Sequence, residues 1–256
     1  MSSTIRRDGP DHIPVVAGER YSKEFETALS RLGQSEPVSQ HFSGPHGWQS
    51  WLKRLFDLAG ATVGGLVLLP VFLAVAIGIK LTSPGPILFR QKRIGKDGKE
   101  FTFYKFRSMI DGDDARHREY SEAFVRNGSE AGLDERGRKV YKITDDPRIT
   151  RVGRFLRRTS LDEFPQLVNV LRGDMSLVGP RPCLPYEWEL YEGWHKARLG
   201  ATPGLTGLWQ VTGRSNVSFN DMVILDLYYL YNWSFLWDLK LILQTIPVII
   251  LGKGGH

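Results

Sequence analysis

The stretch from Leu58 to Ile79 constrains the fold of this chain more than any other part of its sequence. It reads LAGATVGGLVLLPVFLAVAIGI and contains no charged residue over 22 positions. As a straight helix it would measure about 33 Å, long enough for a hydrocarbon core about 30 Å thick. It lies too far from the N-terminus, and lacks the cleavage site, of a signal peptide. The sequence therefore predicts a helix inserted in a membrane.

Pro70 lies near the middle of this segment, where its missing N–H should kink or break the helix. Basic residues flank both ends of the segment: Lys53, Arg54, Lys80, Arg90, Lys92 and Arg93. Basic flanks favour the cytoplasmic side of a membrane, so two such flanks are best satisfied with both ends in the cytoplasm. Two structures stay open on these residues alone: a kinked spanning helix, or a re-entrant helix that breaks at Pro70 and returns.

The segment divides the chain into three parts. We expect a polar, mobile N-terminal tail over 1–47, the membrane-inserted helix over 48–81, and a further domain over 82–256. The expected fold class is α+β and mainly helical. Apolar and polar residues alternate from Ile87 to Met109 around Asp97-Gly98, which predicts a β-hairpin.

Further elements of the last domain follow from its sequence pattern. The patterns predict an amphipathic helix over 187–198, a turn over 203–207, a strand over 208–214, and a C-terminal helix over 226–251. The C-terminal helix is rich in Tyr and Trp beside Leu and Ile. Two placements stay open for it: ordinary core, or the membrane interface, which its aromatic residues favour.

Charge and cysteine content narrow the function classes. The chain of 256 residues carries a formal net charge of +6, which favours an anionic partner such as a phosphorylated substrate, a membrane surface or nucleic acid. It has one cysteine, Cys183, which excludes an intrachain disulfide and a cysteine-based metal site. The histidines show no ligand spacing, so a zinc site is not expected.

Two adjacent carboxylates, Asp162 and Glu163, stand in the stretch TSLDEFPQL between a basic segment and an apolar one. Helix capping explains them on these nine residues alone, since Ser160 and Glu163 have the spacing of a capping box. Acids in a first helical turn also complement the helix dipole. Catalysis is compatible with capping, because a helix N-terminus keeps a carboxylate ionised.

Several basic residues are candidates for binding phosphate. Pro180 and Pro182 flank Arg181, and two prolines fix the backbone in a way that suits a preorganised guanidinium group. The hairpin carries Lys105 and Arg107 among its basic positions, which are a solvated face or a surface for phosphates and anionic headgroups. Asp113-Asp114 and Asp145-Asp146 are acidic pairs that sometimes hold a metal–nucleotide, but each fits a solvated turn.

Six blocks in this order resemble the bacterial sugar transferase family, the small monotopic phosphoglycosyl transferases. They are KRLFD (Lys53–Asp57), the apolar segment with Pro70, YKFRSM (Tyr104–Met109), SLDEFPQL, GDMSLVGPRP and PGLTGLWQVTGR. The resemblance runs from about Trp51 to the C-terminus, and the tail before it lies outside.

The resemblance implies transfer of a sugar 1-phosphate from a UDP-sugar to undecaprenyl phosphate, with release of UMP, at the start of polysaccharide synthesis. It also implies a re-entrant helix, Mg²⁺, and an active site on the cytoplasmic face of the bacterial inner membrane. Asp162 is the implied nucleophile of a covalent phosphosugar intermediate, and Glu163 a supporting base. Both are candidate metal ligands.

Residues that would bind the phosphates of the substrates are Arg157, Arg181, Lys105, Arg107 and Arg214. The expected partners are the UDP-sugar, undecaprenyl phosphate and membrane lipids, and not nucleic acid. The sequence does not select the sugar, although a hexose such as galactose or glucose is our expectation, and it leaves homo-oligomerisation open. The alternatives are a glycosyltransferase that releases UDP and a non-catalytic basic scaffold at the membrane surface.

Overall fold

The computed structural model describes residues 44–110, 115–127, 132–133, 139–140, 148–212 and 217–250. Most of the expected tail over 1–47 lies outside the described residues, as do both acidic pairs at 113–114 and 145–146, and Arg214. The described part is mainly helical and contains small two-stranded sheets, which confirms the α+β class.

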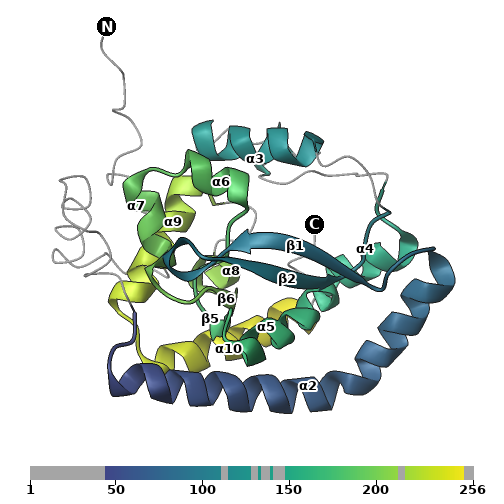
Figure 1. The fold of residues 1–256 in the computed structure, drawn as a ribbon, viewed down its shortest axis with the longest axis horizontal. Helices are drawn as coiled ribbons and strands as arrows, with labels where there is room; N and C mark the ends of the chain where they lie inside the picture. Colours follow the sequence, from purple (N-terminus) through teal and green to yellow (C-terminus); the bar gives the residue numbers. More distant parts are fainter. Residues whose placement is uncertain are drawn as a thin grey trace, which may run out of the picture.

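One long helix, α2 (Trp48–Thr82), runs along one side of the molecule (Figure 1). This helix of 35 residues is long enough, and contains an apolar stretch long enough, to cross a membrane, as the sequence predicts. The helix continues through Pro70 and bends before it ends (Figure 1), so the predicted interruption is a bend in one continuous helix. A proline removes one backbone hydrogen bond, which packing beyond it can offset; here Val75 and Ile79 are buried.

The predicted hairpin is confirmed. Strand β1 (Leu88–Ile94) pairs antiparallel with β2 (Glu100–Phe106), and Leu88 lies opposite Phe106. The connection contains the short helix η3 (Lys96–Gly98), in which Asp97 and Gly98 both have positive φ. That backbone conformation is the reason why Asp-Gly favours a tight hairpin turn.

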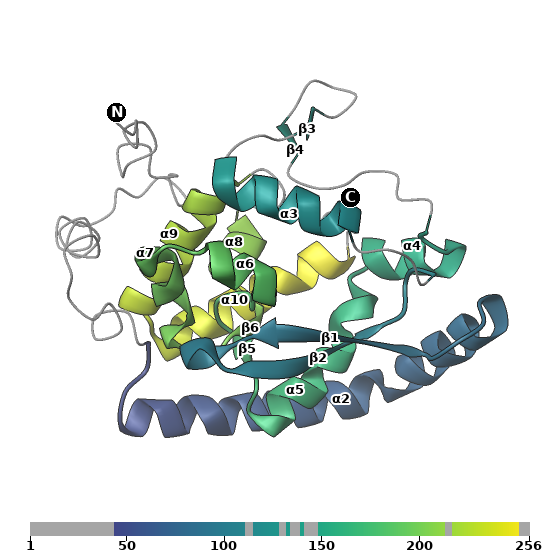
Figure 2. The same ribbon diagram turned by 45° about the horizontal axis from the view of Figure 1, so that its top comes forward.

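The acid pair lies in the second of three consecutive helical elements, which come after β4 in the chain. They are α4 (Arg151–Arg158), the 3₁₀ helix η4 (Leu161–Gln166) and α5 (Leu167–Arg172). Strand β5 (Ser176–Val178) comes next and pairs in parallel with β6 (Gly204–Thr206). Figures 1 and 2 show α5 between α2 and the hairpin. Helix η4, which carries the acid pair, packs against β2, and the ring of its Phe164 lies 5.9 Å from that of Phe72 on α2.

The remaining elements are α3 (Ala115–Asn127), β3 (Gly132–Leu133), β4 (Lys139–Val140), α6 (Pro185–Leu190), α7 (Gly193–Lys196), η5 (Ala197–Gly200), α8 (Leu208–Thr212), α9 (Phe219–Tyr231) and α10 (Phe235–Ile250). They correct four of the predictions. The single helix over 187–198 is wrong, because the backbone is extended at Tyr191 and Glu192 and divides it into α6, α7 and η5. The predicted turn over 203–207 contains β6, whose pairing with β5 could not be foreseen from local pattern.

The predicted strand that begins at Leu208 is instead helix α8, which turns Leu208 into the core beside α9, while 213–214 lie outside the described residues. The predicted C-terminal helix is two helices, separated where Asn232 caps α9 and the Ser234 hydroxyl accepts from the Trp237 amide. α9 is core, with nine buried residues, whereas α10 exposes Leu236, Leu243 and other apolar side chains.

Three apolar clusters hold the elements together. The largest surrounds α9, and the second joins the hairpin to α5 and to Ala61 of α2. The third joins Val75 and Ile79, in the second half of α2, to Phe106 of β2 and Leu156 of α4. Both halves of α2 therefore pack against the same body.

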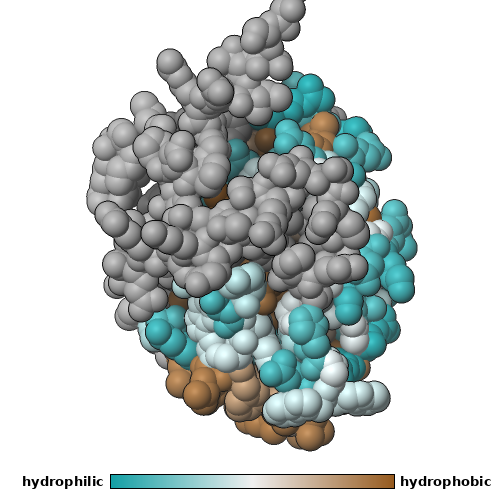
Figure 3. All heavy atoms as spheres, turned by 90° about the vertical axis from the view of Figure 1, so that its left-hand side faces the viewer, coloured by the Kyte–Doolittle hydropathy of each residue, from teal (hydrophilic) through white to brown (hydrophobic). Residues whose placement is uncertain are grey.

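The opposite side of α2 is not covered by the described residues. Five large apolar side chains on that side are each about two thirds exposed or more: Trp48 (72%), Trp51 (79%), Leu66 (67%), Val67 (69%) and Leu81 (80%). Figure 3 shows hydrophobic atoms gathered at the lower end of the molecule, the side along which α2 runs in Figure 1. An apolar face of this size on one side of a molecule is typical of contact with a membrane or a partner.

Candidate active site

The acid pair lies at a sharp turn between α4 and η4. Ser160 adopts the left-handed region (φ 55°), and Asp162 and Glu163 occupy the first turn of η4, which packs against β2. The capping predicted for Ser160 is wrong, since the Ser160 side chain makes no capping hydrogen bond. A capping residue needs extended backbone, and Ser160 instead accepts from the Glu163 amide through its carbonyl, at 3.2 Å. Strained backbone of this kind often marks functional sites.

Basic side chains from β2, from α4 and from the loop between β5 and α6 lie near the two acids. Lys105 of β2 places its Nζ 2.7 Å from Oε1 of Glu163 and 3.9 Å from Oδ2 of Asp162. Arg181 places its Nη1 3.7 Å from the same Oε1. Arg157 of α4 is close enough to stabilise the ionised form of Asp162. The structure thus brings together five residues that the sequence nominates.

Asp162 is buried, with 6% of its surface exposed. Burial raises the pKa of Asp162 above its usual range, Glu163 adds to that rise, and Lys105 and Arg157 oppose it. A carboxylate taken out of water is a stronger nucleophile than a hydrated one once it is ionised, and nearby cations favour that ionised form. The same cations would screen the charge of an incoming phosphate.

The position of Arg157 depends on how α4 meets the end of the hairpin. Thr150 caps α4 by accepting from the Gly153 amide at 2.8 Å, and its own amide donates to the Ser108 carbonyl at 3.1 Å. A Cβ on Gly153 would collide with the Ser108 backbone, so the close approach requires glycine. Arg157 Nε then donates to the Ser108 hydroxyl at 3.2 Å, which fixes the guanidinium beside Asp162.

Asn169 joins α5, which directly follows the acid-bearing η4, to strand β2, which carries Lys105, and the sequence analysis did not identify it. It is completely buried on α5, donates to the Thr102 carbonyl at 2.7 Å and accepts from the Tyr104 amide at 3.3 Å. It therefore replaces a missing strand partner of β2 and fixes α5 against the hairpin. An asparagine within a short apolar helix is the signal that could have indicated it.

Two of the basic residues predicted to bind phosphate, Arg107 and Arg214, are not placed beside the acid pair by any contact among the described residues. Arg107 is buried and its Nη2 donates to the carbonyl and the hydroxyl of Ser83, both at 2.8 Å. It fastens the end of α2 to the hairpin, and a Cβ on Gly85 would collide with its guanidinium. Arg214 lies outside the described residues.

The acid pair can hold a divalent metal of a particular kind. Mg²⁺ is commonly held by one or two carboxylates together with the phosphates of a substrate. Asp162 and Glu163 supply two adjacent carboxylates, and in the part of the chain that the structure describes no group of three or more His, Cys, Asp or Glu forms another metal site. Two adjacent carboxylates therefore suit a Mg²⁺ ion whose other ligands come from a substrate.

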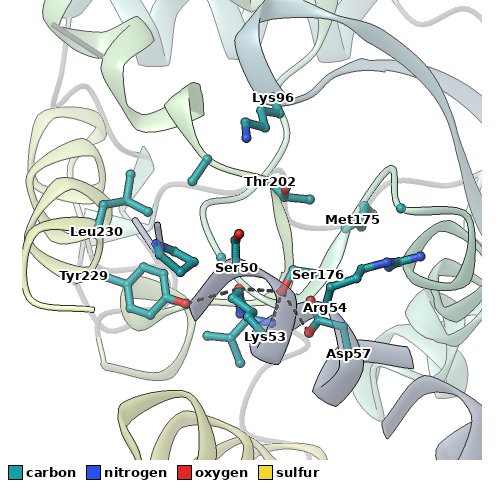
Figure 4. A pocket seen from close by; sticks show the side chains of 15 residues that line it. Ser50, Lys53, Arg54, Asp57, Lys96, Met175, Ser176, Thr202, Tyr229 and Leu230 are labelled. Atoms are coloured by element: carbon teal, nitrogen blue, oxygen red, sulfur yellow. Dashed lines mark hydrogen bonds between the residues drawn. The ribbon is translucent and has the colours of Figure 1, made fainter. Parts of the chain in front are cut away.

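A cavity of about 150 Å³ lies elsewhere, at the start of α2 (Figure 4). Its polar lining includes Lys53, Asp57 and Tyr229, and none of the nominated phosphate-binding or catalytic residues lines it. Lys53 is paired with Asp238 at 2.6 Å, and Asp57 accepts from the Ser176 hydroxyl and the Leu177 amide at 3.0 Å. These polar groups hold α2 to the body, and we do not place the chemistry here.

Comparison with known proteins supports the resemblance seen in the sequence. The family model described as bacterial sugar transferase matches residues 48–252. The exopolysaccharide production protein ExoY of Sinorhizobium fredii is 43% identical over 204 residues, which cover 80% of this chain and 88% of that protein. The chain spans less than half the length of some curated relatives and nearly nine tenths of others.

Two further relatives carry names that describe a reaction. The UDP-glucose:undecaprenyl-phosphate glucose-1-phosphate transferase of Caulobacter vibrioides is 39% identical over 80% of this chain and 72% of that protein. The undecaprenyl-phosphate galactose phosphotransferase of Salmonella typhimurium is 40% identical over 80% of this chain and 42% of that protein. The family match covers most of the chain and includes every residue of the acid pair and its cations. The chain belongs to the bacterial sugar transferase family.

Proposed function

We propose that this chain transfers a sugar 1-phosphate from a UDP-sugar to undecaprenyl phosphate, releasing UMP and initiating the synthesis of a polysaccharide or glycoconjugate. The observation that carries the proposal is the buried carboxylate of Asp162 beside Glu163, with Lys105, Arg157 and Arg181 around the pair. Relatives named as glucose-1-phosphate and galactose phosphotransferases support the same class of reaction. They also make a hexose the first sugar to test.

The first step would be attack by a carboxylate oxygen of Asp162 on the β-phosphorus of the UDP-sugar. The bond from that phosphorus to the bridging oxygen breaks, UMP leaves with the electron pair, and a phosphosugar–aspartate remains. Arg181 and Lys105 would hold the phosphate oxygens in line, as a positioned cation does for a charge that develops in the transition state. Mg²⁺ bound at Asp162 and Glu163 would supply further neutralisation of the diphosphate and the departing UMP.

The second step would regenerate the enzyme. An oxygen of undecaprenyl phosphate attacks the same phosphorus, the acyl–phosphate bond breaks, and Asp162 leaves as a carboxylate. The product is the undecaprenyl diphosphate sugar, so every bond broken is balanced by one formed. Glu163 would accept any proton that the incoming phosphate carries, and its contact with Lys105 at 2.7 Å holds its carboxylate beside Asp162.

The bent helix supports a re-entrant arrangement at the cytoplasmic face of the bacterial inner membrane. Lys53 near its start is bound to Asp238, and Ser83 just after its end is bound to Arg107. A helix that crossed the bilayer would have its ends on opposite sides, whereas both ends of α2 contact the same body of the protein. The exposed apolar side of α2 would enter one leaflet, and α10 would lie at the interface.

The topology has a direct test. Cys183 is the one cysteine of the chain and is buried, so cysteines introduced at exposed Ser50 and Thr82 can be labelled selectively. A re-entrant helix predicts that a maleimide that cannot cross the membrane labels neither position in intact spheroplasts and both in inverted vesicles. Labelling of one position in each preparation would establish a spanning helix instead.

The reaction is tested by nucleotide release from a panel of UDP-sugars, with purified protein in nanodiscs, Mg²⁺ and undecaprenyl phosphate. We expect UMP with the cognate sugar, and without the lipid we expect one equivalent of UMP and exchange of labelled UMP into the UDP-sugar. Asp162→Asn should abolish both, while Glu189→Gln, an exposed acid on α6, should change neither. Release of UDP would establish glycosyl transfer, and no nucleotide release with intact lipid binding would favour a membrane-surface scaffold.

A further inference from the structure

We propose that the buried ion pair between Arg198 and Asp226 positions Arg181 for its contact with substrate phosphate. The inference deepens the proposed function and rests on it, because it concerns the loop that presents a phosphate-binding side chain. Arg198 and Asp226 lie on η5 and α9, outside the acid pair, and the sequence analysis did not single out either for a role at the site.

The pair is more deeply buried than any charged group of the acid site. Arg198 is 1% exposed and Asp226 is completely buried, and Nη2 of the arginine lies 2.7 Å from Oδ2 of the carboxylate. The free energy needed to remove two charges from water often exceeds the free energy gained from their attraction. A protein with apolar residues of similar volume in place of the pair is therefore frequently as stable. A buried pair of this kind therefore needs a reason other than stability.

The second contact of Arg198 supplies that reason. The same Nη2 donates to the backbone carbonyl of Arg181 at 3.0 Å. Arg93 is also buried, and its Nη1 donates to the carbonyl of Pro182 at 3.3 Å, while the carbonyl of Pro180 accepts from the Gly204 amide at 2.8 Å. The backbone carbonyls of residues 180, 181 and 182 thus each accept a hydrogen bond from another part of the chain.

Proline chemistry explains why the loop is held in this way. Pro180 and Pro182 have no N–H, so neither residue can fasten the loop by donating a backbone hydrogen bond. Their carbonyls are the remaining polar groups, and a guanidinium is rich in N–H donors that can reach them from another element. The loop is held by its acceptors, and the Arg181 side chain projects from it toward Glu163, at 3.7 Å.

Asp226 has a separate task, which is to neutralise Arg198. Without it, Arg198 would be a second buried cation beside the 180–182 loop, in addition to Arg93 of β1. Burial raises the pKa of Asp226 to about 6, and the Arg198 charge opposes that rise, so the carboxylate is ionised at neutral pH. The Arg198–Asp226 pair is therefore neutral and adds no net charge next to Arg181. Arg198 and Asp226 are positioning residues, since neither is placed against the acids.

The competing explanation is that the pair only stabilises the core. A double substitution distinguishes this explanation from the positioning of Arg181. Arg198→Met together with Asp226→Leu removes both charges at similar volume and should keep the thermal midpoint close to that of the native protein. If the pair positions Arg181, kcat/KM for the UDP-sugar should nevertheless fall roughly 10- to 100-fold, as expected for a displaced catalytic contact. Arg198→Lys, which keeps the charge and one donor, should recover part of that loss.

A double-mutant cycle with Arg181→Ala provides the deciding measurement. We expect Arg181→Ala to lower kcat/KM in the native background and to have little further effect in the Met/Leu background, because the contact is already lost there. An equal loss in both backgrounds, or full activity of the folded Met/Leu protein, would overturn the inference. If Met/Leu does not fold, the cycle is run with Arg198→Lys, in which the contact is only partly kept. Arg181→Ala should then lower kcat/KM by a smaller factor than in the native background, and an equal loss in both backgrounds would overturn the inference.

The failure of the proposed function would look different. UDP in place of UMP, or persistence of activity in Asp162→Asn, would overturn the reaction assigned to the acid pair whatever the cycle shows. Full activity of Arg181→Ala in the native background would overturn the inference alone, because the loop would then present nothing that the reaction uses.

Discussion

Asp162 and Asp238 are both buried carboxylates beside a lysine, and they differ in how completely their oxygens are used. Asp238 accepts from Tyr229 at Oδ1, at 2.6 Å, and from Lys53 and Trp233 at Oδ2, at 2.6 and 3.1 Å. For Asp162 the lysine is 3.9 Å away, and it makes its shorter contact with Glu163. Both oxygens of Asp238 therefore accept short hydrogen bonds. Asp162 lies near a lysine at 3.9 Å but makes no short ion pair with it.

The difference separates a structural acid from a candidate nucleophile. A carboxylate whose lone pairs are already engaged gains stability and loses reactivity, because an attacking oxygen must first give up its donors. Asp238 ties α10 to the start of α2 and has no oxygen to spare. Asp162 carries the burial penalty of a charged group without that compensation, which is characteristic of active sites, where stability is given up for function.

The largest expected effect is the loss of activity in Asp162→Asn. An amide cannot form the acyl phosphate, so transfer should fall by at least about 1,000-fold, which corresponds to roughly 4 kcal/mol in the barrier. UMP release from the cognate UDP-sugar measures it. The protein should remain folded and bind nanodiscs, and substantial residual turnover would show that Asp162 is not the nucleophile.

Asp238→Ala should do the reverse and damage the fold. It leaves Lys53 buried without its partner and removes the acceptor of the Tyr229 hydroxyl, so we expect a loss of about 3–5 kcal/mol in the free energy of unfolding. The thermal midpoint of the protein in nanodiscs measures the loss. Lys53→Met with Asp238→Leu is the matched control and should be markedly more stable than Asp238→Ala alone. Equal midpoints would mean that the pair is not what holds α2.

The sequence predicted the parts of the fold that depend on local pattern. The uncharged run up to Ile79 predicts α2, and Asp97-Gly98 between alternating strands predicts the hairpin; both are confirmed. It failed where pairing is remote. The segment over 203–207 looks like a turn and becomes β6, because its partner β5 lies about 28 residues earlier in the chain. Leu208 begins a helix because α9 offers it a buried site.

The candidate site shows the same division. Asp162 and Glu163 stand out because adjacent acids between a basic and an apolar stretch are unusual, and Arg181 stands out because prolines flank it. Asn169, Arg198 and Asp226 do not, since each acts through a residue far away in the sequence. Arg107 matches the basic pattern of the hairpin but is bound to Ser83, and only the structure distinguishes that role.

A smaller effect is expected for Lys105→Gln, which changes the acid site without removing the nucleophile. Its charge lowers the pKa of Asp162 and steadies Glu163, so its loss should reduce kcat by about 10- to 100-fold and raise the pKa of Asp162 further. Because the ionised carboxylate is the nucleophile, the acid limb of the pH–rate profile should move to higher pH. Lys99→Gln, an exposed lysine of the same hairpin, is the control and should leave the profile unchanged. An unshifted limb in Lys105→Gln would show that this lysine does not set the ionisation of Asp162.

The smallest effect concerns stability and reports the uncompensated burial of Asp162 directly. Burial raises the folded-state pKa of this carboxyl, so over the interval between its ordinary and raised values the folded protein binds more protons than the unfolded chain. Stability from this group is therefore present at low pH and is lost as the pH rises through the folded-state pKa. Asp162→Asn does not titrate, so its thermal midpoint relative to the native protein should increase from pH 4 to pH 7, at about 2–4 °C for each kcal/mol. A difference that stays constant over that range would mean that the cations compensate Asp162 as fully as Lys53 and its neighbours compensate Asp238, and the distinction between the two carboxylates would then rest on geometry alone.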